Sequence, residues 1–174
     1  MLIKPRIIEI KDIDNVEVKF KISRIPAIHF LELLKKYPLD SKIIPQIDNE
    51  TLFSIFSYVA CYDNNSYITL DEDYKINKYI QDTETLLKIE TQLILYNIDF
   101  LQNRKKVRFK NGGEEAKYKY MNVDAGIASI ISNKFATMHE LRTIYDYEDF
   151  CNLLEITHVN ISNEIYAQEK AQKK

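Results

Sequence analysis

The chain has 174 residues, enough for one domain with a substantial buried core. Hydrophobic residues make up 45% and charged residues 29% of it, a composition that excludes a disordered chain. The net charge of −2 excludes a global attraction to nucleic acid or to an anionic membrane. Charges and a proline near the N-terminus argue against a secretory signal, and no window holds the roughly 18 apolar residues of a membrane span. We expect a single domain over residues 1–174, located in the cytosol.

The N-terminal residues predict a β-hairpin that leads into a helix. Residues 16–22 alternate apolar and charged side chains, the pattern of a half-buried strand, and residues 7–10 can pair with them across a turn at 12–15. Pro26 suits the first turn of the following helix, which should end before Pro38.

A second helix is predicted over residues 50–62, capped by Asp48 or Asn49, because apolar side chains surround most of its circumference. Residues 67–70 form a short strand or an extended segment, and the acidic run at 71–73 is predicted to be a solvated loop.

The longest periodic run of apolar residues begins at Thr83 and predicts a helix that ends near Asn103. In residues 104–123, basic residues alternate with valine, phenylalanine and tyrosine on both sides of a turn that contains two glycines. This pattern predicts an exposed β-hairpin inserted between helices.

Three more helices are predicted after this hairpin. The first covers residues 123–133, and the second opens with a capping box formed by Thr137 and Glu140. Asp146 can cap the third, which ends in a polar tail at 167–174.

These elements together predict an α+β fold that is mainly helical, with an N-terminal hairpin and a mid-chain hairpin on a helical core. Residues 1–103 form the strand-plus-helix body, 104–123 the inserted hairpin, and 124–174 a C-terminal helical region.

No complete catalytic constellation is present, and we predict neither a cofactor nor a metal site. Cys61 and Cys151 lack the CxxC spacing of a zinc site and are interpreted as buried thiols. The histidines at 29, 139 and 158 have no metal-binding spacing, and the first is interpreted as a residue at the edge of the core. A nucleophile pair between Cys151 and a histidine would require the fold to bring the two together.

The stretch YDYEDFCNLLEI at 145–156 places three carboxylates, Asp146, Glu148 and Asp149, before a run of apolar residues. Such a cluster could belong to an active site. The alternative is the start of a helix, where capping and the helix dipole favour negative charge. We favour the helix start, because the apolar stripe begins directly afterwards at Phe150.

Basic residues beside aromatic residues in the predicted mid-chain hairpin could bind nucleic acid, because cations neutralise phosphates while rings stack on bases. The candidates are Lys105, Lys106, Arg108, Tyr118 and Tyr120. The alternative is a solvated hairpin whose aromatic face packs on the body, which is favoured by two glutamates at the tip.

Three segments carry a family resemblance: KFKISRIPAIHFLELL at 19–34, TLLKIETQLILYNIDFLQN at 85–103 and TMHELRTIYDYEDFCNLLEITHVNISNE at 137–164. In order and wording they resemble the tail assembly chaperones of tailed bacteriophages. The resemblance implies a non-enzymatic protein of the host cytoplasm. Such a protein binds the tape-measure and tail-tube proteins during assembly and then leaves the particle. The basic hairpin departs from the mostly helical pattern of that family.

Wide apolar helix faces suit the binding of a helix in a groove of another protein. The predicted partner-contacting residues lie on the last helix, with two second choices on the longest periodic run: Tyr147, Phe150, Leu154 and Ile161, then Tyr96 and Phe100. These faces could instead be used up in the chain's own core. A permanent component of the virion tail or baseplate and a nucleic-acid-binding module are the alternative functions, and an enzyme is not expected.

Overall fold

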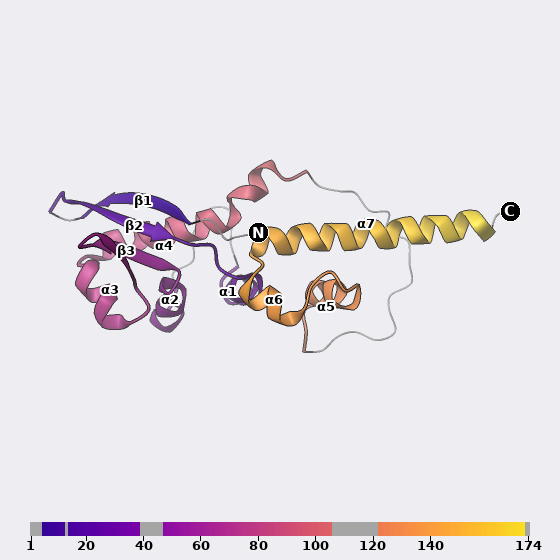
Figure 1. Cartoon of the computed structure of the whole chain (residues 1–174), viewed down its shortest axis with the longest axis horizontal. Helices are drawn as coiled ribbons and strands as arrows, with labels where there is room; N and C mark the ends of the chain where they lie inside the picture. The colour runs from indigo at the N-terminus through magenta and orange to yellow at the C-terminus, as the bar shows by residue number, and fades with distance from the viewer. Residues whose placement is uncertain (1–4, 13, 39–46, 106–121, 173–174) are drawn as a thin grey trace.

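The computed structural model describes residues 5–12, 14–38, 47–105 and 122–172. It has the predicted α+β fold, mainly helical, in which helices pack against one face of an antiparallel sheet. The molecule is elongated, with the sheet at one end and a long helix projecting at the other (Figure 1).

The sheet is a meander of four antiparallel strands in the order β1-β2-β3-β4. Their bounds are β1 Arg6–Lys11, β2 Glu17–Ile22, β3 Val59–Asp63 and β4 Ser66–Thr69. The predicted N-terminal hairpin is confirmed as β1 and β2. Phe20 lies opposite Ile8 on one side and Cys61 on the other, so these side chains share the face that the helices cover.

The helices are α1 Ala27–Lys36, α2 Asn49–Phe56, α3 Asp73–Tyr79, α4 Thr83–Ile98, α5 Ala125–Ser132, α6 Met138–Thr143 and α7 Tyr147–Gln172. A 3-10 helix, η1 Asp99–Asn103, extends α4 to the predicted end. The predicted caps are confirmed. Asp48 accepts a hydrogen bond from the Thr51 amide, and Thr137 and Glu140 form a reciprocal capping box.

The prediction of a helix over residues 50–62 is wrong in its second half. The helix ends at Phe56, and residues 59–63 form β3, which pairs with β4 across a two-residue turn. Asn64 and Asn65 in that turn have φ angles of 47° and 65°, a left-handed conformation that asparagine tolerates well. Cross-strand pairing with residues 20–22 and 66–69 therefore overrides the apolar pattern, which suits a helix and a buried strand alike.

The acidic run at 71–73 is exposed, as predicted, and only its last residue, Asp73, belongs to α3. The ammonium group of Lys75 joins the run by ion pairs of 2.6 Å to Asp71 and 2.7 Å to Glu72. One further prediction needs correction. The residues predicted to be a polar tail continue α7 as far as Gln172. Exposed lysine, glutamate and glutamine are good helix formers, so a polar composition alone did not end the helix.

The predicted mid-chain hairpin lies almost wholly outside the described residues, which resume at 122. Among the helices that the structure describes, none is both long and apolar enough to cross a membrane.

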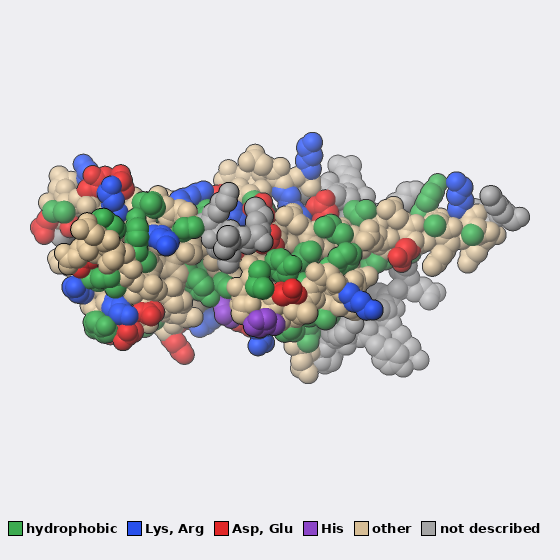
Figure 2. All heavy atoms as spheres, viewed as in Figure 1, with side chains coloured by type: hydrophobic (Ala, Val, Ile, Leu, Met, Phe, Trp, Pro, Cys, Tyr) green, Lys and Arg blue, Asp and Glu red, His purple; other side chains and the backbone are tan. Residues whose placement is uncertain are grey.

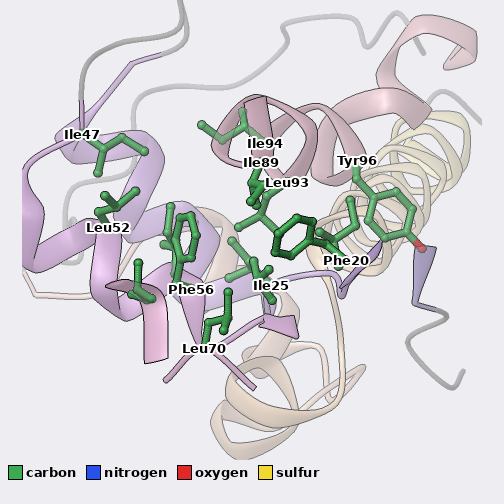
Figure 3. Close-up of a cluster of buried hydrophobic side chains, with 14 of the residues drawn as sticks. Phe20, Ile25, Ile47, Leu52, Phe56, Leu70, Ile89, Leu93, Ile94 and Tyr96 are labelled. Carbon is green, nitrogen blue, oxygen red and sulfur yellow. The ribbon is translucent and has the colours of Figure 1, made fainter. Parts of the chain in front are cut away.

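The buried side chains form two clusters. The sheet core joins the covered sheet face to α1, α2, α3 and α4, and Phe20, Phe56, Ile89 and Leu93 converge at its centre (Figure 3). The helix core joins α1 to α5, α6 and α7. Opposite sides of α1 serve the two clusters, with Phe30 in the sheet core and Ile28 in the helix core, so α1 holds the two halves together.

A buried carboxyl group on α4 gives a testable pH effect. Glu90 is 4% exposed, and within the described residues no hydrogen bond or ion pair reaches its carboxyl group. Burial raises the pKa of Glu90 because a low-dielectric environment disfavours the charged form. The folded state therefore holds this proton more tightly than the unfolded state. The stabilisation that the protonated Glu90 gives to the folded state is fully present below its unfolded pKa. It is lost as the pH rises through its folded pKa.

We expect Glu90→Gln to raise the free energy of unfolding at about pH 8 by about 1 kcal/mol, or 2–4 °C in Tm, because the substitution removes a buried charge. At about pH 4 the gain should largely disappear, since the glutamate is then protonated in the folded state. Thermal unfolding at the two pH values measures the difference. A variant that is less stable than the wild type at the higher pH would contradict the expectation.

Candidate functional site

Two carboxylates of the acidic stretch at 145–156 contact one arginine. Arg24 lies between β2 and α1, and its side chain is only 14% exposed. Its Nη1 donates to Glu148 at 2.5 Å and to Asp146 at 3.3 Å, and its Nη2 donates to Asp99 at 3.3 Å. The guanidinium also lies 5.1 Å from the ring centroid of Tyr96. Although burial lowers the pKa of Arg24, the three carboxylates outweigh it and raise the pKa overall.

Two further polar contacts of the stretch belong to the start of α7. Asp146 accepts a hydrogen bond of 2.9 Å from the amide of Asp149, as predicted for a helix cap. Asp149 in turn accepts one of 3.4 Å from the amide of Asp146. Burial, together with the charge of Asp146, raises the pKa of Asp149. The carboxylates therefore hold α7 to the body and do not form an open acid–base pair.

Aromatic side chains close the same junction. The ring of Tyr147 lies 5.1 Å from that of Phe30, 5.9 Å from that of Phe100 and 6.1 Å from that of Phe150, between ring centroids. Burial raises the pKa of Tyr147 to about 12. Tyr147 borders both the sheet core and the helix core, so the first turn of α7 closes the gap between them.

The cysteine beside this junction is poorly suited to nucleophilic chemistry. Burial raises the pKa of Cys151, so the thiolate is scarce at neutral pH. The guanidinium of Arg104 donates to the Cys151 carbonyl oxygen at 2.6 Å and to the Glu155 carboxylate at 2.8 Å, an arrangement that supports the helix backbone.

The histidines do not join this junction. His29 is exposed, unlike the predicted core-edge residue, and its Nδ1 lies 3.0 Å from the Tyr58 hydroxyl oxygen. His139 and His158 are exposed as well. In the described ranges, no group of three or more His, Cys, Asp or Glu side chains is arranged to hold a metal ion.

The predicted partner-contacting residues fall into two groups. Phe150 is 5% exposed in the helix core, and Tyr96 is 7% exposed under the guanidinium groups of Arg6 and Arg24, so the chain itself covers both. The other four are half-buried: Tyr147, Leu154, Ile161 and Phe100.

The exposed apolar residues of α7 lie further along the helix. Ile156 is 46%, Ile165 41% and Tyr166 66% exposed, and none of them was among the predicted contacts. The spacing of four residues from Ile161 to Ile165 indicates in the sequence that both side chains lie on the same face of the helix. We call residues 158–172 the distal arm. At 1.5 Å per residue it is about 20 Å long.

The distal arm projects past the body, with hydrophobic side chains interspersed among polar ones along it (Figures 1 and 2). From Ser162 to Gln172 every residue is exposed. A helical segment of this length is only marginally stable in water without packing partners. A covering partner would therefore stabilise the arm.

The predicted nucleic-acid site is described only at its start, where Lys105 is exposed. Lys106, Arg108, Tyr118 and Tyr120 lie outside the described residues.

Comparisons of the chain with protein-family models, with curated proteins and with solved structures gave no match. The junction around Arg24 and the distal arm are therefore interpreted from their own geometry.

Proposed function

We propose that this chain is a non-enzymatic protein-binding protein that holds its partner through the distal arm of α7. The observation that carries the proposal is the contrast along one helix. The first half of α7 packs on α1, α4 and α5, whereas residues 162–172 are exposed and include Ile165 and Tyr166. A helix with exposed apolar side chains can lie in an apolar groove of another protein.

The resemblance to tail assembly chaperones supplies the proposed setting. In it, the chain acts in the host cytoplasm during phage tail morphogenesis and binds the tape-measure and tail-tube proteins. Tyr147 and Phe150 pack on the body of the chain and anchor the first half of α7, while residues 162–172 are exposed. This arrangement supports binding through the distal arm.

The test is co-purification after co-expression with the tape-measure and tail-tube proteins of the same genome. Replacing both Ile165 and Tyr166 with serine should lower the recovered partner about tenfold or more, because these are the most exposed apolar residues of the arm. The matched control replaces Asn163 and Gln168, two exposed polar residues of the same arm, with serine. Both double variants should keep the wild-type Tm to within the small change typical of surface substitutions.

Two results would count against the proposal. Equal recovery of partner with both double variants would remove the arm from the interface. Stoichiometric amounts of the chain in finished particles, measured by mass spectrometry, would favour a permanent virion component over a chaperone.

A further inference from the structure

Among the described residues, the first strand of the sheet is paired on one side only, and the polar groups of its other, free edge can be assigned. The Asp12 amide donates to the Val16 carbonyl at 3.0 Å, and the Val16 amide donates to the Asp12 side chain at 2.8 Å, so the two residues occupy a hydrogen-bonded position of the β1–β2 hairpin. Because such pairs alternate along an antiparallel ladder, Ile8 and Ile10 also bond toward β2. The backbone N–H and C=O groups of the residues between and beside them point out of the sheet. These residues are Ile7, Glu9 and Lys11.

The second ladder gives the same assignment independently. The Ser23 amide donates to the Tyr58 carbonyl at 2.8 Å, so the odd-numbered residues of β2 bond toward β3. The even-numbered residues, including Phe20, are left for β1, in agreement with the first ladder. β1 thus presents a regular free edge, with no residue out of register along its six-residue pairing with β2.

A groove runs beside this free edge. It has a volume of about 460 Å³ and is lined by the four consecutive residues Ile8–Lys11 of β1 and by Lys88 and Gln92 of α4. Leu95 follows on the same stripe of α4 and is 40% exposed. Because Ile8 and Ile10 face the side on which α4 packs, a strand added to β1 would place alternate side chains between the sheet and α4. β1 forms the border of the sheet in Figure 1.

The charges beside the groove favour an acidic occupant. Glu9 is paired with Lys19 at 2.9 Å, and Lys88 is paired with Glu84 at 2.7 Å. Lys11 has no ion-pair partner in the part of the chain that the structure describes. An acidic side chain next to Lys11 would therefore complete the pairing of charges along this edge.

The sequence of β1 argues against a second copy of the same strand as the occupant. Antiparallel pairing of two copies that aligns all three outward-pointing residues, Ile7, Glu9 and Lys11, sets one Glu9 directly opposite the other, and like charges in that position are destabilising.

We propose that the β1 edge and the groove beside α4 bind an extended segment of a partner protein by strand addition. Every second residue of the segment is apolar and enters the groove over Ile8 and Ile10. The segment also carries an acidic residue beside Lys11. The free N–H and C=O groups of the edge supply the main-chain hydrogen bonds of such a complex. This site is separate from the distal arm and does not depend on the function proposed for it.

The probe is a library of short random peptides displayed on yeast and selected on the full chain. In the selected peptides every second residue should be apolar, and each peptide should contain an acidic residue. Their affinity should fall about tenfold or more for Glu9→Pro, because proline removes an outward N–H group and leaves the peptide carbonyl unpaired. The matched control is Glu9→Ala, which keeps the N–H group and should change the affinity less than about threefold. Circular dichroism establishes that both variants are folded.

Amide hydrogen exchange on the wild-type chain is a second readout that needs no variant. A bound peptide should slow exchange at Ile7, Glu9 and Lys11, whereas Ile8 and Ile10 already bond to β2. Peptides should bind a chain with Ile165 and Tyr166 replaced by serine as tightly as the wild type, so a failure of the arm proposal leaves this one testable. The proposal is overturned if exchange at those three amides is unchanged, or if no peptide depends on the Glu9 N–H group. Wild-type self-association that Glu9→Pro abolishes would overturn the assignment to a different partner protein.

Discussion

Replacing Arg24 with methionine is expected to lower the free energy of unfolding by about 2–3 kcal/mol, because it removes the shared cation of a partly buried ion-pair network. Methionine keeps most of the apolar packing over Tyr96 but leaves Asp99, Asp146 and Glu148 without their shared cation. Urea unfolding of the variant and the wild type measures the loss.

A neighbouring arginine provides the control. Arg6 forms an ion pair with Asp99 at 2.7 Å, but its side chain is 44% exposed. Arg6→Met should therefore lower the free energy of unfolding by no more than about 1 kcal/mol. Equal losses from the two substitutions would show that burial of Arg24 does not decide its contribution.

Arg24 also shows why only half of the junction was predictable. The acidic residues at 146–149 could be assigned to a helix start, because capping depends on residues close together in the sequence. Their cation could not be assigned, since Arg24 is 122 positions from Asp146 and 124 from Glu148. Local spacing has no information about which distant side chain the fold will bring to a helix terminus.

The same limit applies to β3. Residues 59–63 are apolar enough for a helix or a buried strand, and their pairing with residues 20–22 decides between them. The two asparagines at 64 and 65 were a local signal for the hairpin turn. The N-terminal hairpin was predictable because its alternating pattern and its turn lie within a few residues of each other.

Helical spacing likewise predicts an apolar stripe on α7 but not what covers it. Phe150 and Ile165 lie on the same helix, yet the first is 5% and the second 41% exposed. The difference arises because the contacts of α7 with α1, α4 and α5 end part-way along the helix. Whether an apolar residue of α7 is buried in the chain's own core therefore differs from one residue to the next.

Phe150→Ala tests whether the first half of α7 is anchored in the helix core. We expect it to lower the free energy of unfolding by about 3–5 kcal/mol, because it leaves a cavity among Ile28, Ile130 and Leu141 in the helix core. Denaturant unfolding measures the loss.

Ile165→Ala is the matched control on the same helix, and it should change the free energy of unfolding by less than about 0.5 kcal/mol because its site is exposed. The two variants should behave in the opposite way in the partner assay. Ile165→Ala should weaken binding while the chain stays folded, whereas Phe150→Ala, at a temperature where it is still folded, should bind as the wild type does. If Phe150→Ala instead weakened binding without loss of stability, α7 would have to leave the body to meet its partner, and the first half of the helix would belong to the interface.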